Sequence, residues 1–419
     1  MHIETEPTQH LQRAAAAARA ASHILARSPA TQRNAALHAM AVALRTASPA
    51  ILAANATDLV HFSGSAAFRD RLVLTGPRVE AMAQGLDDIA ALPDPLGRVQ
   101  ADWARPNGLR IQRLATSIGV IGMIYESRPN VGADAAGLCL KSGNAVILRG
   151  GSESLHSARA INTALTDGLR AAGLPEACVQ IAPNTDRAYV AAMLAAAGLL
   201  DLIIPRGGKS LVERVQREAC VPVLAHAEGL CHTYVHAAAD PTMARAIVVN
   251  GKLRRAAVCG ATETLLIDRS IAATLLPGIV ADLRARGCDF RADAAARDIV
   301  SDLPAANETD FDTEWLDAIL SIAVVDGVDA ALAHIARHGS EHTDAIVTED
   351  AVAAEHFLAG LDSAVGLWNA STQFCDGGEF GFGAEIGIAT GRIHARGPVG
   401  LEQLTTYRYV VRGTGQVRP

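Results

Sequence analysis

Between residues 117 and 225 the sequence repeats a strand, a short loop and a helix, and this order constrains the fold more than any other feature. Continuous apolar runs bounded by turn residues are typical of strands that are buried on both faces of a sheet. Gly173 and Pro175 end one of the intervening helices in the usual order. The pattern predicts a parallel, doubly wound sheet of the α/β class. Its strands are expected at Ile118–Tyr125, Asn144–Leu148, Cys178–Ala182, Asp201–Ile204 and Val221–Ala225.

The segments outside this region show other patterns. Residues 8–61 are rich in alanine with spaced Leu, Ile and Met, and they predict two or more amphipathic helices that separate at Ser28-Pro29. Asn107-Gly108 lies between two partly alternating segments and predicts a β-hairpin with a two-residue turn. The acidic stretch 290–318 predicts irregular structure, and Leu404–Arg412 alternates like a strand.

Length, charge and cysteine usage narrow the class of protein. A chain of 419 residues is expected to form two or three domains. The net charge of −7 argues against a general nucleic-acid binder. The seven cysteines are scattered, without a CxxC pair or a Cys/His ligand spacing. A disulfide framework is therefore not expected, and neither is a metal site.

Two observations bear on location. The N-terminus carries Glu4 and Glu6 and lacks the basic start and apolar stretch of a secretory signal. The apolar stretch Ala188–Pro205 is interrupted by Asp201 and predicts no membrane span. Together with the free cysteines, these features predict a soluble cytoplasmic protein.

Cys259 is the first sign of an enzyme. It follows Lys252, Arg254 and Arg255 and precedes Gly260. Nearby positive charge lowers the pKa of a thiol and raises the fraction of thiolate, which is the nucleophilic form. An inert thiol at the start of a strand explains the same local sequence, so this segment alone leaves both interpretations open.

Two loops share a design that suits a nucleotide or another anion. Each follows a buried strand, contains paired glycines and opens a helix, whose N-terminus presents free N–H groups. Neither loop matches the dinucleotide fingerprint, and Ile203 stands where a Walker loop needs glycine. Tight turns without a ligand are the alternative. The predicted cofactor-binding residues are Arg149, Gly150, Gly151, Ser152, Glu153, Pro205, Arg206, Gly207 and Gly208.

Longer motifs identify a resemblance. Residues 121–131, 138–151, 202–208, 231–235 and 341–346 resemble the aldehyde dehydrogenase superfamily and, within it, the γ-glutamyl phosphate reductase family. The tail matches best, from Trp368-Asn369-Ala370-Ser371-Thr372 through residues 394–398 to Thr405-Thr406-Tyr407. The resemblance runs from the N-terminal helices to the last strand.

The resemblance implies an architecture. A Rossmann-type NADP-binding domain is expected over residues 1–228, with part of 366–395. A catalytic α/β domain that contains Cys259 is expected over 229–365. A small β arm made from 98–116 and 396–419 would join copies of the chain into a homo-oligomer.

The resemblance also implies an activity, the NADPH-dependent reduction of L-glutamyl 5-phosphate to L-glutamate 5-semialdehyde in proline biosynthesis. The Cys259 thiolate would displace phosphate and form a thioester, and glutamate 5-kinase is a candidate for handing over the substrate. Asn130 is a candidate oxyanion donor, although a helix N-cap explains it equally well. Arg149 could contact a 2′-phosphate, while Glu153 could hold a ribose hydroxyl instead. The expected substrate-binding residues are Arg128, Lys252, Arg255 and His342, the last because it lies in a polar loop.

Several residues depart from the family pattern. Gly260 stands where asparagine is usual, and Gln373 stands where a basic residue is common. The glutamate that activates water in hydrolytic relatives has no counterpart in the Leu224–Gly229 segment, which suits a thioester that must exclude water. Two alternatives remain: an acylating dehydrogenase that uses a CoA thioester, and a weak paralogue kept as a nucleotide-binding subunit. The other matched cysteines, Cys139, Cys178 and Cys231, are expected to be packing residues.

Overall fold

The computed structural model describes residues 6–63, 66–126 and 128–418 and divides the chain into two compact units. The first unit runs to Ala225 and also includes Gly381–Gly387 and the chain from Val399 onward. The second unit contains His226–Phe380 and Ile388–Pro398. The expected boundary after residue 228 thus lies three residues beyond the observed one, and the glycine-rich stretch near the C-terminus is shared between the units.

A four-stranded parallel sheet forms the centre of the first unit, in the order β5-β4-β3-β6. Its strands are β3 (Val120–Tyr125), β4 (Ala145–Arg149), β5 (Val179–Ile181) and β6 (Leu202–Arg206). The order runs outward from β3 to β5 and then reverses to β6, so the switch point lies between β3 and β6. Ligands of doubly wound folds bind at this point, beyond the carboxyl ends of the strands. The predicted parallel α/β sheet is confirmed.

The strand expected at Val221–Ala225 is wrong. Only a single bridge joins Val223 to Ile203 there. The Ile203 N–H donates to the carbonyl of Pro222, and Pro222 has no N–H to continue the ladder. The residues therefore extend along β6 without forming a strand.

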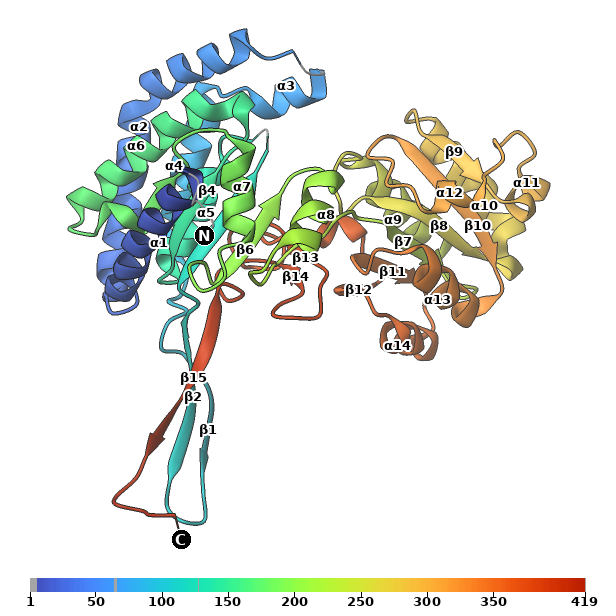
Figure 1. Cartoon of the computed structure of the whole chain (residues 1–419). Helices are drawn as coiled ribbons and strands as arrows, with labels where there is room; N and C mark the ends of the chain where they lie inside the picture. The colour runs from blue at the N-terminus through green and yellow to red at the C-terminus, as the bar shows by residue number, and fades with distance from the viewer. Residues whose placement is uncertain (1–5, 64–65, 127, 419) are drawn as a thin grey trace, which may run out of the picture. The chain divides into compact units, whose positions relative to one another are not determined.

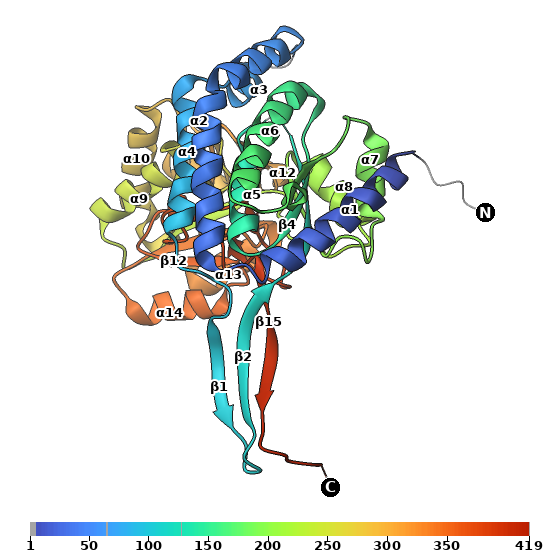
Figure 2. The same ribbon diagram turned by 90° about the vertical axis from the view of Figure 1, so that its left-hand side faces the viewer.

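Helices pack on both faces of this sheet. On one face, α1 (Glu6–Leu25), α7 (Arg187–Leu194) and α8 (Lys209–Glu218) share a core with the strands. That core includes Leu11, Tyr189 and Val215 against Val120 and Ile147. Strands β4 and β5 also contact α5 (Val131–Lys141) and α6 (Leu155–Ala171), against which α2 (Ala30–Val60) and α4 (Gly76–Ala91) pack (Figure 2). A short helix, α3 (Ala66–Leu72), follows α2, and the predicted separation at Ser28-Pro29 is confirmed.

Helix α2 is long and apolar enough to cross a membrane by length and composition. Its polar side chains bind other segments of the first unit. The buried Asp58 carboxylate accepts hydrogen bonds from the backbone N–H of His156 and Ser157 at the start of α6. Arg33, almost fully buried, pairs with Asp94 at 2.6 Å. These contacts join α2 to the rest of the first unit, and a carboxylate stabilises the N-terminus of the helix that it caps.

Three antiparallel strands form a separate ribbon in the first unit, ordered β1-β2-β15 (Figure 1). They are β1 (Val99–Ala104), β2 (Arg110–Ser117) and β15 (Thr405–Arg412). The predicted hairpin is confirmed, but its two-residue turn is wrong. The Gly108 N–H donates to Arg105 O and the Arg105 N–H to Leu109 O, and Gly108 alone has a positive φ, of 86°. This is a type I turn closed by a glycine bulge, and it suits Pro106, whose fixed φ fits the second position.

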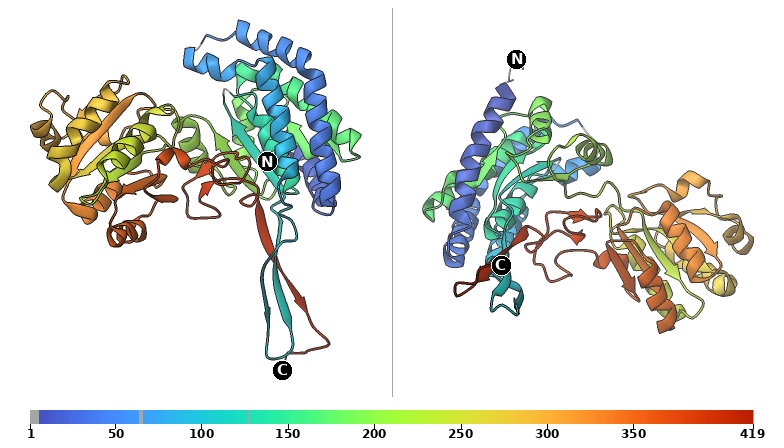
Figure 3. Two further views of the ribbon diagram at one scale, coloured as in Figure 1. Left: turned by 180° about the vertical axis from the view of Figure 1, so that it is seen from behind. Right: turned by 60° about the horizontal axis from the view of Figure 1, so that its bottom comes forward.

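A six-stranded parallel sheet forms the second unit, in the order β12-β11-β7-β8-β10-β9 (Figure 3). Its strands are β7 (Cys231–Val235), β8 (Thr262–Asp268), β9 (Asp289–Ala292), β10 (Ile319–Val325), β11 (Thr343–Val347) and β12 (Val365–Trp368). Leu265 and Ile267 face one core, and Leu266 between them faces another. This alternation places α9 (Pro241–Leu253), α10 (Arg269–Arg284) and α11 (Ala294–Ile299) on one face, and α12 (Glu308–Phe311), α13 (Gly327–His338) and α14 (Ala351–Gly360) on the other.

The expectation of irregular structure over 290–318 is only partly right, because β9, α11 and α12 lie within or across it. Shorter elements complete the chain. They are the 3₁₀ helices η1 (Ser152–Ser154), η2 (Glu176–Cys178) and η3 (Thr372–Phe374) and the paired strands β13 (Ile388–Ala389) and β14 (Gly397–Pro398).

Candidate active site

Cys259 lies in the turn that leads from α9 into β8, at the amino end of that strand. Its side chain is half-buried and packs against Val365, Cys375 and Ile388. The wall beside the sulfur is therefore apolar, which keeps water away from a bond formed there.

The backbone of Cys259 is held by the segment that leads into β7. Gly229 lies so close that a Cβ built on it would be 2.0 Å from the Cys259 carbonyl oxygen. The Gly229 N–H donates to Glu314 at 2.9 Å, which fixes the glycine in place. Two residues later, the Cys231 thiol donates to the same carbonyl at 3.1 Å. The peptide that carries the nucleophile is thus clamped, and only glycine fits at 229.

Gly229→Ala is expected to lower kcat/KM by about 100-fold, because the new methyl group must push the Cys259 backbone away and small displacements of reacting groups carry penalties of that order. The matched control is Gly76→Ala, where nothing lies within 4 Å of the added carbon. Steady-state kinetics of both variants, with thermal melting to show that each is folded, check this. Equal activity of the two variants would contradict it.

Cys231 was expected to be a packing residue, and it is fully buried. Burial raises the pKa of its thiol well above the usual range, aided by the carboxylate of Asp344. It therefore remains a thiol and can serve as a hydrogen-bond donor to Cys259. The prediction of packing was right about burial and missed the hydrogen bond, for which the sequence of β7 offers no signal.

Two histidines lie beside Cys259. One side-chain ligand atom from each of His226, Cys259 and His342 lies within 4.8 Å of those of the other two. The two rings meet edge to face, with their centroids 5.2 Å apart. His342 lies in the loop that directly precedes β11, as expected, but its side chain is fully buried. It lies close to the nucleophile because β11 is the neighbour of β7 in the sheet.

The hydrogen bonds of the rings indicate their tautomers. His226 Nδ1 lies 2.8 Å from the carbonyl oxygen of Ile388, which can only accept, so Nδ1 carries the proton. His342 Nδ1 lies 2.9 Å from Thr343 Oγ1 and 3.5 Å from Cys231 Sγ. Because the Cys231 thiol donates to Cys259, its sulfur and Thr343 Oγ1 can both accept the Nδ1 proton. The Nε2 atom of each neutral ring is then a lone-pair acceptor.

Lys252 is not placed to bind substrate, contrary to the prediction. It is fully buried, and its Nζ lies 2.5 Å from the Glu263 carboxylate, which is itself buried. The helix pattern already contained this signal, since Ala244, Val248 and Lys252 follow at intervals of four and share the buried face of α9. Arg255, three residues further on, is exposed, and its role as a substrate-binding residue stays a prediction.

Gln373 supports the same loop from the other side. Its amide nitrogen donates to Gly251 O at 2.9 Å and to Arg255 O at 3.3 Å. It thereby holds the last turn of α9 and the start of the cysteine loop. A neutral amide that donates to two carbonyls fits here, where a free cation would need an acid as well. The departure from the family pattern therefore has a structural role.

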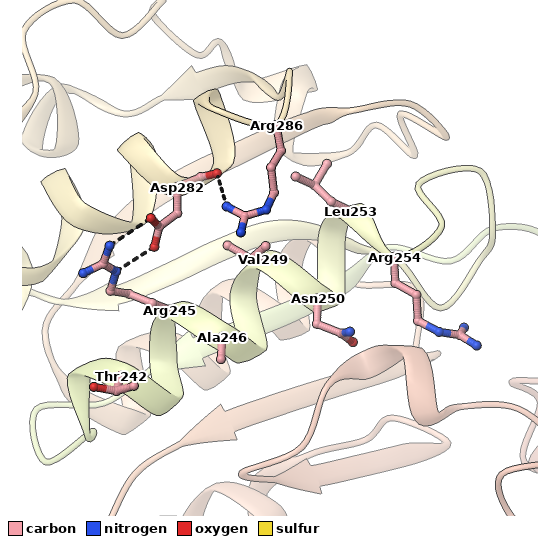
Figure 4. A pocket seen from close by; sticks show the side chains of 9 residues that line it. All are labelled: Thr242, Arg245, Ala246, Val249, Asn250, Leu253, Arg254, Asp282 and Arg286. Carbon is pink, nitrogen blue, oxygen red and sulfur yellow. Dashed lines mark hydrogen bonds and ion pairs between the residues drawn. The ribbon is translucent and has the colours of Figure 1, made fainter.

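A cavity of about 610 Å³ in the second unit lies along α9 and α10, and Cys259 is not among the residues that line it (Figure 4). Arg245 binds the Asp282 carboxylate there, and Arg286 donates to the Asp282 carbonyl. None of the predicted catalytic or substrate-binding residues is among the described residues that line it. Its size alone does not make it the active site.

In the first unit, the loop that follows β6 does not offer an empty anion site. The Glu126 carboxylate accepts from the Gly208 N–H at 3.1 Å, at the start of α8. A Cβ on Gly207 would lie 2.5 Å from the same carboxylate. The Glu126 carboxylate therefore lies where a phosphate group was predicted to bind, at Pro205, Arg206, Gly207 and Gly208. In this structure it is the anion that stabilises the N-terminus of α8.

The loop that follows β4 remains the better cofactor candidate. Gly150 and Gly151 line a small hollow together with Ile181, Ala182 and Asn184, at the carboxyl ends of β4 and β5. Ser152 and Glu153 form a 3₁₀ turn that leads into α6. This is the edge of the sheet where α/β folds bind nucleotides.

Arg149 itself is turned away from a ligand. Its guanidinium donates to the carbonyls of Gly150 and Thr185, at 2.9 and 2.7 Å. Burial lowers its pKa, although acidic neighbours oppose the change. In this arrangement Arg149 shapes the glycine loop and does not present its charge to a 2′-phosphate.

Asn130 and Arg128 lie between β3 and α5, next to the switch point. Asn130 is the N-cap residue of α5, as the alternative interpretation expected, but its side chain makes no capping hydrogen bond. Its amide donates to Asp134 at 3.1 Å, and burial raises the pKa of Asp134 to about 6. The roles of Asn130 as an oxyanion donor and of Arg128 as a substrate ligand stay predictions.

Comparison with known proteins agrees with this geometry. The model of the aldehyde dehydrogenase family matches residues 1–295. A γ-glutamyl phosphate reductase of Gluconobacter oxydans is 72% identical over 403 residues, which cover 96% of this chain and 94% of the relative. One from Acidiphilium cryptum is 69% identical and covers 98% and 97%. The crystal structure of γ-glutamyl phosphate reductase from Thermotoga maritima, 42% identical, has a TM-score of 0.96 and covers 98% of this chain and 100% of that one.

These matches cover nearly the whole of both chains, and the family model covers more than half of this one. They confirm the aldehyde dehydrogenase-like fold, the class of oxidoreductase and a small molecule as substrate, and enzymes of this family use a nicotinamide cofactor. The chain therefore belongs to the aldehyde dehydrogenase family and, within it, to the γ-glutamyl phosphate reductases.

Proposed function

We propose that this chain reduces L-glutamyl 5-phosphate to L-glutamate 5-semialdehyde and phosphate, with NADPH as the reductant, in proline biosynthesis. The observation that carries the proposal is the near-complete match to reductases of that name at identities of about 70%. The structure supports it with a half-buried thiol, a clamped backbone and two imidazoles at the same place.

The nucleophile in the proposed reaction is the Cys259 thiolate. It attacks the acyl carbon, the bond from this carbon to the phosphate oxygen breaks, and phosphate leaves. An acyl phosphate has a good leaving group, so activation of the thiol matters more than acid assistance. An Nε2 atom of His226 or His342 is suited to accept the thiol proton, because both rings carry their proton on Nδ1 and lie beside the sulfur.

A bound nicotinamide would supply the hydride that converts the thioester into the aldehyde and regenerates the Cys259 thiolate. The chain protects the thioester in the meantime. Val365 and Ile388 form an apolar wall beside Cys259. The segment that leads into β7 carries glycine at 229, where a side chain cannot fit. Hydrolysis is thereby disfavoured relative to hydride transfer.

We assign the cofactor to the edge of the first unit where Gly150 and Gly151 line the hollow beyond β4 and β5. Ser152 and Glu153 follow in the 3₁₀ turn and complete the proposed cofactor site, with Glu153 as the proposed ligand of a ribose hydroxyl. NADP as the cofactor is supported by an engineered glycolyl-CoA reductase of the same fold, with a TM-score of 0.67 and 15% identity, which was solved with bound NADP⁺. Arg128 and Arg255 are the proposed ligands for the carboxylate and phosphate of the substrate.

We also propose that the chain assembles into a homo-oligomer through the ribbon of β1, β2 and β15. The ribbon exposes Trp103, Tyr407 and Tyr409, and large exposed aromatic side chains are enriched at interfaces. A strictly monomeric mass in solution at micromolar concentration would contradict this. A cytoplasmic location is also part of the proposal. Glutamate 5-kinase is proposed to hand over the substrate, because the acyl phosphate is labile.

The reverse reaction tests the function. The chain is incubated with L-glutamate 5-semialdehyde, NADP⁺ and inorganic phosphate, and the absorbance of NADPH is followed. We expect NADPH to form only when phosphate is present. A signal that needs CoA in place of phosphate would instead identify an acylating aldehyde dehydrogenase. No turnover in a chain that still binds NADPH would leave the role of a nucleotide-binding subunit.

A further inference from the structure

The cluster of His226, Cys259 and His342 has the residue types and the spacing of a metal site. The three residues come from separate segments: the start of the second unit, the loop before β8 and the residue before β11. Their ligand atoms lie within 4.8 Å of one another. An ideal tetrahedral zinc site needs such atoms about 3.5 Å apart, by the usual Zn–N and Zn–S bond lengths. Side-chain rotations of about 1 Å would close that difference.

The second observation is the buried Nε2 of His342. This atom has no hydrogen-bond partner among the described residues, although His342 is fully buried. Buried polar atoms are paired in nearly all cases, so an orphaned nitrogen on a ring of this cluster points to a ligand. A water-sized or ionic ligand would satisfy it.

The tautomers make both rings suitable ligands. Metal-binding imidazoles usually donate their other ring N–H to a carbonyl or a similar acceptor, which fixes the ring and raises its basicity. His226 donates Nδ1–H to Ile388 O, and His342 has Thr343 Oγ1 within 2.9 Å of its Nδ1. Each neutral ring can thus offer the lone pair of its Nε2 atom as a metal ligand.

We propose that Cys259, His226 and His342 form a binding site for Zn²⁺, which reversibly blocks the nucleophile. Zn²⁺ is borderline-soft and takes thiolate and imidazole together in tetrahedral sites. On binding, the Cys259 S–H bond breaks, its proton leaves to solvent and a Zn–S bond forms, with no change of oxidation state. Water completes the fourth position. The blocking effect rests on the proposed function, because it requires Cys259 to be the nucleophile, whereas metal binding itself does not.

Metal binding is measured on the full chain without substrate, by competition for Zn²⁺ with a chromophoric chelator. Co²⁺ serves as an optical probe, because thiolate ligation gives a charge-transfer absorption. We expect one equivalent to bind, and Cys259→Ala and His226→Ala to weaken Zn²⁺ affinity by at least about tenfold. His226 is only partly buried, so its variant is the safer one to fold, and His342→Gln tests the third ligand. The matched controls are Cys220→Ala and His356→Ala, both at exposed positions, and they should bind as the original chain does.

Equal Zn²⁺ affinity in the original chain, Cys259→Ala and His226→Ala would overturn the site. So would a Co²⁺ complex that lacks the thiolate band. We further expect Zn²⁺ at its binding concentration to abolish reductase activity and EDTA to restore it, and Zn²⁺ that binds without inhibiting would overturn the blocking role. Zn²⁺ binding is measured without turnover, so it does not depend on the proposed function. If the proposed function is wrong, the metal-free chain will show no reductase activity.

Discussion

Cys259→Ser is expected to lower kcat of the reductase by at least about 10³-fold while leaving the fold unchanged. A serine hydroxyl is far less nucleophilic than a thiolate, and an oxygen ester is a poorer hydride acceptor than a thioester. The imidazoles remain in the variant and cannot compensate, since the hydroxyl proton is held too tightly. Serine fits the site because the side chain is only half-buried.

The measurement is the phosphate-dependent formation of NADPH, together with alkylation of the native chain and mass spectrometry to show which cysteine reacts. Cys220→Ser is the matched control, because Cys220 is exposed and lies in the other unit. It should keep full activity, and alkylation of Cys259 should abolish it. Activity of Cys259→Ser within about tenfold of the original chain would show that another group is the nucleophile.

The sequence was sufficient to predict the parallel sheet of the first unit, because its strands are continuous apolar runs that suit a sheet buried on both faces. The prediction failed where a single proline altered the backbone hydrogen bonds or the turn type. Pro222 interrupts the ladder that its apolar neighbours suggested, and Pro106 turns the hairpin into a type I turn with a glycine bulge. These errors are local and follow from the missing N–H and fixed φ of proline.

Only those parts of the candidate site that depend on residues close together in the sequence could be predicted. Cys259 could be found, because its loop and family pattern are local. His342 was assigned to substrate because of its loop, but its position beside Cys259 depends on the pairing of β11 with β7, which the sequence of neither strand specifies. The same holds for Glu126, whose carboxylate reaches the start of α8 across the β3–β6 pair.

Lys252 shows that positive charge alone is a misleading signal for a substrate-binding residue. Its position after the apolar residues of α9 marked it as buried, yet a cation near a cysteine was taken for a substrate ligand. Counting positive charges near Cys259 in the sequence therefore overstated the field at its sulfur, because the Lys252 ammonium is paired with Glu263. The two imidazoles beside the thiol are therefore the better candidates for its activation.

Lys252→Met is expected to destabilise the chain by about 3–5 kcal/mol at pH 8, because it leaves the Glu263 carboxylate buried without its partner. Burial already raises the pKa of Glu263 to about 7, against the opposing effect of Lys252. The folded chain therefore holds this proton more tightly than the unfolded chain does. The stabilising contribution of the protonated acid is complete below the unfolded pKa, near 4.5, and is lost as pH rises toward 7.

Without Lys252 the pKa of Glu263 rises further, so the folded variant continues to lose stability as the pH increases above 7. The destabilisation by Lys252→Met should accordingly be larger at pH 8 than at pH 6, as measured by urea unfolding at both values. The matched variant is Lys252→Met with Glu263→Gln, which removes the charge and keeps an oxygen for the Leu316 N–H, 3.3 Å away. It should recover more than half of the lost stability at pH 8. A double variant no more stable than Lys252→Met, or a loss independent of pH, would show that the buried carboxylate is not what the lysine stabilises.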